Sequence, residues 1–130
     1  MEMASDRNAE EIGLTEPRTL EELSDALALL GNLTRLRVIA ALKERPMFVQ
    51  ELSSRLGVSY PLLHLHLKNM EKHGLVKSEY KIGTDKTKRY VKRYFSVVDF
   101  RLEVTPDLIA RLDAASEEST NQSDQKQKED

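Results

Sequence analysis

The pattern of apolar positions predicts four helices in the first 73 residues of the chain. The first begins after Thr19, a good N-cap residue that forms a capping-box sequence with Glu22, and ends at Gly31. The second spans about 33–44 and ends before Pro46. The apolar positions expected to form the buried face of this second helix are Leu33, Leu36, Ile39, Ala40 and Leu42.

A glycine separates the third predicted helix, about 48–56, from the fourth, about 59–73. Gly57 suits the left-handed position that follows the end of a helix. Ser59 is an N-cap residue, and Pro61 lies in the first turn, where a missing N–H is tolerated. A helix, a short glycine turn and a capped helix form a helix-turn-helix, so the fourth helix is the candidate recognition helix.

After Gly74 the spacing changes from helical to strand-like. Residues 75–82 alternate between apolar and polar in their second half, and residues 89–97 are rich in aromatic and β-branched residues. The polar turn 83–88 joins the two strands into a β-hairpin with a basic tip. Thr105 begins a last helix, because a proline and an acid follow it. The predicted fold is therefore mainly α with a two-stranded β-wing, α-α-α-α-β-β-α, a winged helix-turn-helix. The aromatic residues expected to pack this hairpin onto the helices are Tyr80, Tyr90, Tyr94 and Phe95.

The predicted elements and the composition divide the chain into three regions. Residues 1–18 lack a sustained period and are predicted to be a flexible acidic arm. Residues 19–115 form the winged helix-turn-helix domain, with dimerisation helices at both of its ends. Residues 116–130 are a polar segment of low complexity and are predicted to be disordered.

The net charge of −2 hides an uneven distribution of charge. Residues 1–25 hold eight acids and two arginines, and residues 113–130 hold six acids and two lysines. The body between them, 26–112, carries 16 lysines and arginines against eight acids. A basic body between acidic ends fits a protein that binds a polyanion, and an ordinary charged surface is the alternative.

Several classes of function lack the residues they need. The chain has no cysteine, which excludes disulfides, thiolate metal sites and thiol redox sensing. His64 and His66 lie two apart on one helix and point in different directions, so we expect no metal. No phosphate-binding loop and no nucleophile beside a base is present, so we expect neither an enzyme nor a cofactor. Without a secretory leader or a long apolar run, the expected location is the cytoplasm, with no membrane contact.

Three stretches resemble the ArsR-type winged-helix repressors. Leu30–Leu42 is similar to the second-helix signature of that family, and Val49–Ser59 to the helix and turn that follow it. His66–Val76 is similar to the exit of the recognition helix, where a His-Leu pair precedes a Gly-Leu-Val entry to the wing. The resemblance covers about residues 26–95 and implies a cytoplasmic, dimeric, DNA-binding regulator of transcription.

The recognition helix departs from the family pattern. Family members commonly carry small polar residues and an arginine where Leu62, His64 and Leu65 stand. Leu62 and Leu65 cannot form hydrogen bonds with base edges. The usual contact between an arginine of this helix and guanine is therefore not expected here. The cysteines and the His/Asp cluster of the family's metal sensors are absent from the sequence. Regulation by a small organic effector remains an alternative, but no residue pattern indicates it.

We therefore predict a homodimeric regulator that binds double-stranded DNA, with helix 59–73 in the major groove and the basic wing 76–97 beside it. Two alternatives are a low-specificity, chromatin-type DNA binder and a winged helix used for protein–protein assembly. We expect His66 to be packed and His73 to lie at a helix C-terminus, where a cation is favourable. The predicted DNA contacts are Ser59, Tyr60, His64, Lys68, Lys86, Lys88 and Arg89. The predicted dimer contacts are Leu20, Leu23, Leu27, Leu30, Leu108, Ile109 and Leu112.

Overall fold

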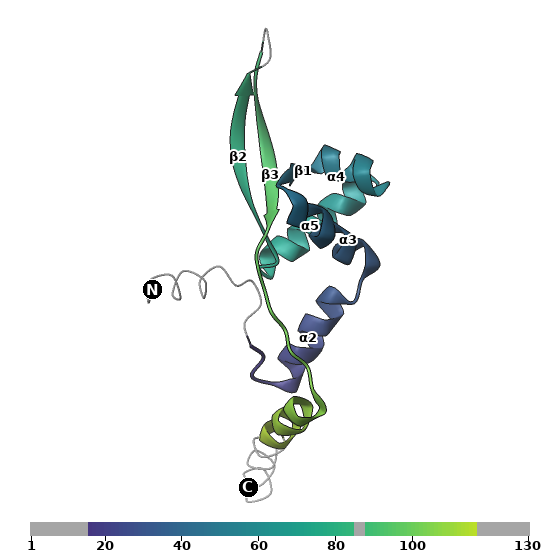
Figure 1. Cartoon of the computed structure of the whole chain (residues 1–130), viewed down its shortest axis with the longest axis vertical. Coiled ribbons are helices and arrows are strands. Elements are labelled where there is room, and N and C mark those ends of the chain that lie inside the picture. The colour runs from purple at the N-terminus through teal and green to yellow at the C-terminus, as the bar shows by residue number, and fades with distance from the viewer. Residues whose placement is uncertain (1–15, 85–87, 117–130) are drawn as a thin grey trace, which may run out of the picture. The chain divides into compact units, whose positions relative to one another are not determined.

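The computed structural model of the chain describes residues 16–84 and 88–116 (Figure 1). These fall into two compact units, one formed by 29–101 and the other by 16–28 with 102–116. The predicted arm and tail lie almost wholly outside the described residues, so the three-part division of the chain stays a prediction.

The first unit contains the predicted helices and hairpin together with one short additional strand. Its elements are α3 (Leu33–Glu44), β1 (Met47–Phe48), α4 (Val49–Leu56), α5 (Tyr60–Lys72), β2 (Val76–Thr84) and β3 (Arg89–Val97). The end of α2 (Leu20–Leu30) also belongs to this unit, because Leu29 is buried in its core. The mainly α, winged helix-turn-helix fold class is thus confirmed.

The sheet has three antiparallel strands in the order β1-β3-β2, so the prediction of two strands was incomplete. Phe48, predicted as the start of a helix, lies in β1 opposite Tyr94, and Met47 lies opposite Phe95. A strand of two residues carries no periodicity of its own, and this one exists because β3 supplies its hydrogen-bonding partner. Met47 is completely buried, and its side chain belongs to the core of the first unit.

The core of the first unit lies between α3, α4, α5 and the base of the sheet. Its fully buried side chains include Val38, Met47, Leu52, Leu63, Leu67, Met70, Leu75 and Phe95. The predicted inner face of α3 was partly wrong, because Leu33 and Leu36 are 73% and 47% exposed and Ala40 is exposed as well. The buried face of α3 holds Val38, Ala41 and Leu42, one step around the helix.

The second unit has a small apolar core of its own. Leu23 of α2 is buried against Leu108 and Leu112 of the helical residues 106–116. Both helices begin at their predicted caps, since the hydroxyl oxygens of Thr19 and Thr105 accept hydrogen bonds from backbone N–H groups three residues on, at 3.0 and 3.1 Å. None of the helices in the described ranges is long and apolar enough to span a membrane.

Candidate nucleic-acid interface

The turn between α4 and α5 has the predicted left-handed glycine. Gly57 has φ 66° and ψ 32°, and its N–H donates to the carbonyl of Ser53 at 2.9 Å. The hydroxyl of Ser53 donates to the carbonyl of Val58 at 2.6 Å, which closes the turn from the other side. These bonds fix the angle at which α5 leaves α4.

Ser59 stands at the N-cap of α5 without making the predicted side-chain cap. Its backbone is extended, and its carbonyl accepts the first helical bond, from Leu63 N at 2.9 Å. Its hydroxyl accepts no hydrogen bond from the start of α5. The first N–H groups of α5 are therefore not satisfied by this hydroxyl, and groups of this kind can bind a phosphate.

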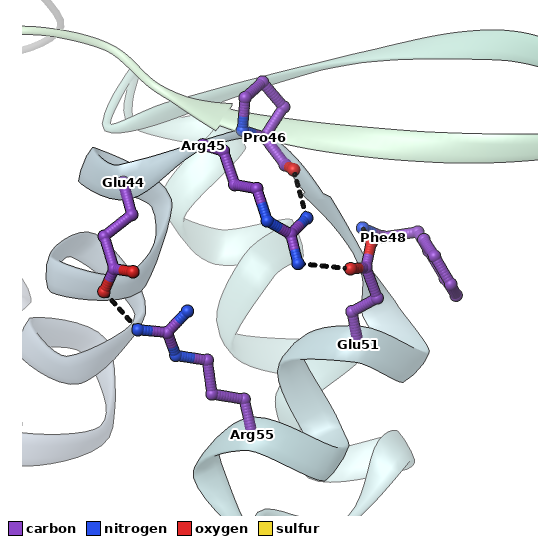
Figure 2. A network of polar contacts seen from close by, with 6 residues as sticks. All are labelled: Glu44, Arg45, Pro46, Phe48, Glu51 and Arg55. Atoms are coloured by element: carbon purple, nitrogen blue, oxygen red, sulfur yellow. Dashed lines mark hydrogen bonds and ion pairs between the residues drawn. The ribbon is translucent and has the colours of Figure 1, made fainter.

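Two ion pairs hold α4 against the end of α3 (Figure 2). Arg45 donates to the carboxylate of Glu51 at 2.7 Å, and Arg55 pairs with Glu44. Glu51 also accepts a bond from the N–H of Phe48 at 3.3 Å. The hydrogen bond with Arg45 lowers the pKa of Glu51 and raises that of Arg45. Both acids of this surface are thereby neutralised by arginines of the same surface.

The helix α5 presents three different sides. Leu63, Leu67 and Met70 point into the core. On the opposite, solvent-facing side lie Pro61, Leu65, Lys68 and Lys72, spaced four, three and four residues apart and all exposed. On the side that faces the wing lie Tyr60, His64 and Lys68.

Two adjoining hollows lie between α5 and the wing. The first, of 190 Å³, is bounded by Tyr60 on the helix and by Val91 and Arg93 on β3. The second, of 370 Å³, is bounded by His64 and Lys68 on the helix and again by Arg93. The rings of Tyr60 and His64 are parallel, with centroids 6.2 Å apart. Three of the predicted DNA-contacting residues therefore share one wall of a groove.

The wing has two unlike faces because strand side chains alternate. Lys77, Lys81 and Lys92 lie on one face, and their cross-strand partners in the ladder belong to the same face. The other face carries three exposed apolar side chains beyond the base of the sheet, Tyr80, Ile82 and Val91. Figure 1 shows β2 and β3 extending beyond the helices as a long hairpin.

The prediction that the aromatic residues of the hairpin pack onto the helices was only partly right. Phe95, at the base, is 1% exposed and does so. Tyr80 and Tyr90, farther along the strands, are 70% and 41% exposed.

A cluster of three polar side chains fastens the base of the wing to α5. Arg93 donates to Glu71 at 2.5 Å and to the hydroxyl of Ser78 at 2.8 Å, and Ser78 donates to Glu71 at 2.5 Å. Glu71 belongs to α5, Ser78 to β2 and Arg93 to β3. This cluster links α5 to the base of the wing, and it uses the single acid of α5.

Two of the three cations predicted at the end of the wing can be placed in the structure. Lys88 and Arg89 are exposed at the start of β3, whereas Lys86 lies outside the described residues. Lys92 is held differently, with its ammonium 4.0 Å from the centre of the Phe48 ring and 4.9 Å from that of Tyr90.

The two other histidines occupy structural positions. Nδ1 of His66 accepts a hydrogen bond from Nε of Arg35 at 3.2 Å. Burial and, after it, the charge of Arg35 lower the pKa of His66. His73 follows the last residue of α5, with Nδ1 2.9 Å from the carbonyl of Asn69. Within the described ranges, no three His, Cys, Asp or Glu side chains gather as a metal site would need.

The predicted dimer contacts divide into two groups. Leu23, Leu108 and Leu112 are buried within one chain, and Leu20 packs against them. Of the other predicted dimer contacts, Leu27 and Ile109 are partly exposed, at 44% and 42%. Leu30 packs against the core of the first unit.

Sequence reasoning missed two residues of this surface. Lys72 belongs to the solvent-facing side of α5, and its spacing of four from Lys68 was the available signal. Arg93 lines both hollows. The register of the hairpin decides that Arg93 faces α5, and this register could not be derived from the sequence.

Taken together, the helix-turn-helix, the following hairpin and the groove between them define a winged helix-turn-helix protein. The family described as "Bacterial regulatory protein, arsR family" matches residues 32–78, which span α3 to the start of the wing. The chain is also 26% identical over 83 residues to the uncharacterized HTH-type transcriptional regulator MJ0229 of Methanocaldococcus jannaschii, covering 64% of this chain and 83% of that relative. Over residues 32–78 the chain is therefore similar to ArsR-type winged helix-turn-helix regulators of transcription.

Solved structures of similar fold include Rv0081 of Mycobacterium tuberculosis, with 23% identity, a TM-score of 0.48, and coverage of 87% of this chain and 98% of that one. Reduced HlyU of Vibrio cholerae has 19% identity and a TM-score of 0.47, with coverage of 85% and 90%. The homodimeric winged helix-turn-helix DNA-binding domain Mb0332 of Mycobacterium bovis has 18% identity and a TM-score of 0.46, with coverage of 82% and 89%.

Proposed function

We propose that the protein is a homodimer that binds double-stranded DNA in the cytoplasm, with α5 in the major groove and the wing against the neighbouring backbone. The observation that carries the proposal is the excess of exposed positive charge on these two elements. The described residues between Ser59 and Val97 hold eight lysines and arginines against two glutamates. Both glutamates are paired within the surface, Glu71 with Arg93 at 2.5 Å and Glu79 with Lys81 at 3.7 Å.

Phosphate neutralisation supplies most of the affinity of such a surface. Lys68 on α5 and Lys88 and Arg89 at the end of the wing are exposed, and no ion pair among the described residues includes them. Lys68 bounds the groove on the α5 side, whereas Lys88 and Arg89 lie farther out along the wing, so the three would contact different phosphates. Ser59 and Tyr60, at the start of α5, add a hydroxyl each, and His64 lies one turn farther along.

Two-fold symmetry is part of the proposal because one recognition helix reads too few base pairs for specificity. A dimer places two such helices one turn of the duplex apart, against the halves of a palindrome. Leu27 and Ile109 are exposed apolar side chains of the second unit, and we propose that the partner covers them.

A second function, protein–protein assembly, is favoured by one observation. Leu62 and Leu65 are 47% and 64% exposed on the helix that should face DNA. Apolar side chains at this place also suit a protein partner. The two functions make opposite predictions about duplex binding.

Selection from a pool of randomised DNA duplexes by the full-length protein tests the proposal. We expect enrichment of a palindromic sequence that binds about a thousandfold more tightly than random duplex at physiological salt. Equal affinity for selected and random duplexes would instead indicate a low-specificity DNA binder. Failure to bind any duplex at low salt would overturn the proposal in favour of protein assembly.

A further inference from the structure

We propose that Leu65 reads thymine in the major groove by contact with its C5-methyl group. This inference deepens the proposed function and rests on it. It assigns a base-reading role to a side chain that has no hydrogen-bonding group.

The position of Leu65 on α5 is the first argument. The side chain is 64% exposed and lies opposite Leu63 and Leu67, which are completely buried. It is therefore near the middle of the side of α5 that points away from the protein. When the helix enters a major groove with this side foremost, Leu65 is among the first side chains to reach the base edges.

The charges around Leu65 indicate what covers it. Lys68 and Lys72 follow at three and seven positions, on the same side of the helix. The acid of α5, Glu71, is bound to Arg93 and Ser78 at the base of the wing. Leu65 thus has lysines around it and no acid on its side of the helix. Such a surface complements a polyanion that also carries apolar groups better than it complements an apolar protein surface.

The chemistry of the groove then selects the base. Thymine carries a methyl group in the major groove, and apolar side chains are its usual contacts. The sequence of α5 contains no arginine for a bidentate contact with guanine. Asn69, which could read adenine, is only partly exposed and lies toward the side of α5 that holds His66.

Leu62 provides a matched control, because it is exposed on the same helix but on a different side. It is 47% exposed and lies one turn from His66, on the flank that the contact between Arg35 and His66 marks as facing α3. A leucine in that place reaches the base edges less directly than Leu65. Neither leucine is buried, so substitution of either leaves the core intact.

The test replaces thymines with deoxyuridine, one at a time, in a duplex obtained by selection from the randomised pool. Deoxyuridine removes the methyl group and keeps the base pairing. We expect one or two thymines in each half-site at which the wild-type protein loses about fourfold in affinity, the effect of burying one methyl group. Leu65→Ala should bind the thymine duplex more weakly by a similar factor and show no further loss with deoxyuridine.

Leu62→Ala should keep the full loss on deoxyuridine substitution, and Leu65→Met, which retains apolar reach, should keep most of it. Titrations at reduced salt keep the weaker complexes measurable. If the selected duplex binds equally well with and without every methyl group, the inference fails while the proposed function stands. A loss of the same size in Leu65→Ala as in wild type also overturns it. Failure to bind any duplex refutes the proposed function itself.

Discussion

Nε of Arg35 donates a hydrogen bond to Nδ1 of His66 across 3.2 Å, and this contact ties the start of α3 to the middle of α5. A second bond from Arg35, to the carbonyl of Leu29 at 3.1 Å, extends the tie to the end of α2. Because the guanidinium only donates, His66 must present an unprotonated nitrogen to it. The position of α5 therefore depends on a neutral histidine.

Stability should consequently fall as the solution becomes acidic. Burial and the charge of Arg35 hold the pKa of His66 below its ordinary 6.5, so the unfolded chain takes up the proton first. Stability is full above the ordinary pKa and declines as the pH falls toward the lowered one. Urea unfolding between about pH 7.5 and about pH 5.5 should show this decline in wild type and a smaller one in His66→Gln. Equal declines in the two proteins would contradict the assignment.

Replacement of Gly57 by alanine should destabilise the helix-turn-helix through the backbone alone. Nothing lies within 4 Å of the position its Cβ would take, but its φ of 66° is unfavourable for an L-residue. We expect a loss of about 1–2 kcal/mol in the free energy of unfolding. Gly31→Ala is the control, since Gly31 is exposed and its φ is not positive. Equal stability of the two variants would show that the turn relaxes at no cost.

Glu71→Gln should loosen the wing at its base. The change removes the charge that holds Arg93, and because both side chains are about a third exposed the loss of stability should be below about 1 kcal/mol. The local effect should be clearer, with faster hydrogen exchange in the paired residues around Ser78 and Phe95. Glu79→Gln, which removes an exposed pair farther along the wing, should leave exchange there unchanged.

Ile109 and Leu112 should respond differently to substitution. Ile109 is 42% exposed, so Ile109→Glu should weaken the proposed dimer without unfolding the chain. Leu112 is 8% exposed in a small core, and Leu112→Ala should cost about 2–4 kcal/mol of stability. Light scattering coupled to gel filtration measures the first effect and urea unfolding the second. A dimer unaffected by Ile109→Glu would place the interface elsewhere.

Most helices and the long strands were predictable from sequence, because residues that begin or end an element are chemical signals. The spans 33–44 and 89–97 were predicted with the bounds that the structure shows, and Gly57 has the predicted conformation. The strand β1 was not predictable, because its two residues form a strand only when β3 lies beside them. Which side of a helix or strand is buried was harder to predict than where the element begins and ends.

The candidate site shows the same limit. Apolar spacing predicted Leu33 and Leu36 as buried, but the packing of α3 against the sheet selects a neighbouring stripe. The arrangement of Tyr60, His64 and Lys68 on one side of a helix followed from spacing alone. That Arg93 faces them across a groove depends on the register of the hairpin and on its bond to Glu71, which no local pattern reports.

Reversal of charge at the end of the wing tests the central claim most directly. Fluorescence anisotropy should follow the binding of a selected duplex over a range of salt by wild type, by Lys88→Glu/Arg89→Glu, and by Lys43→Glu as a control on the exposed end of α3. We predict that the double variant binds at least about tenfold more weakly, with a salt dependence shallower by about two counterions per protomer, and that Lys43→Glu behaves as wild type. Unchanged affinity and salt dependence in the double variant would contradict the account.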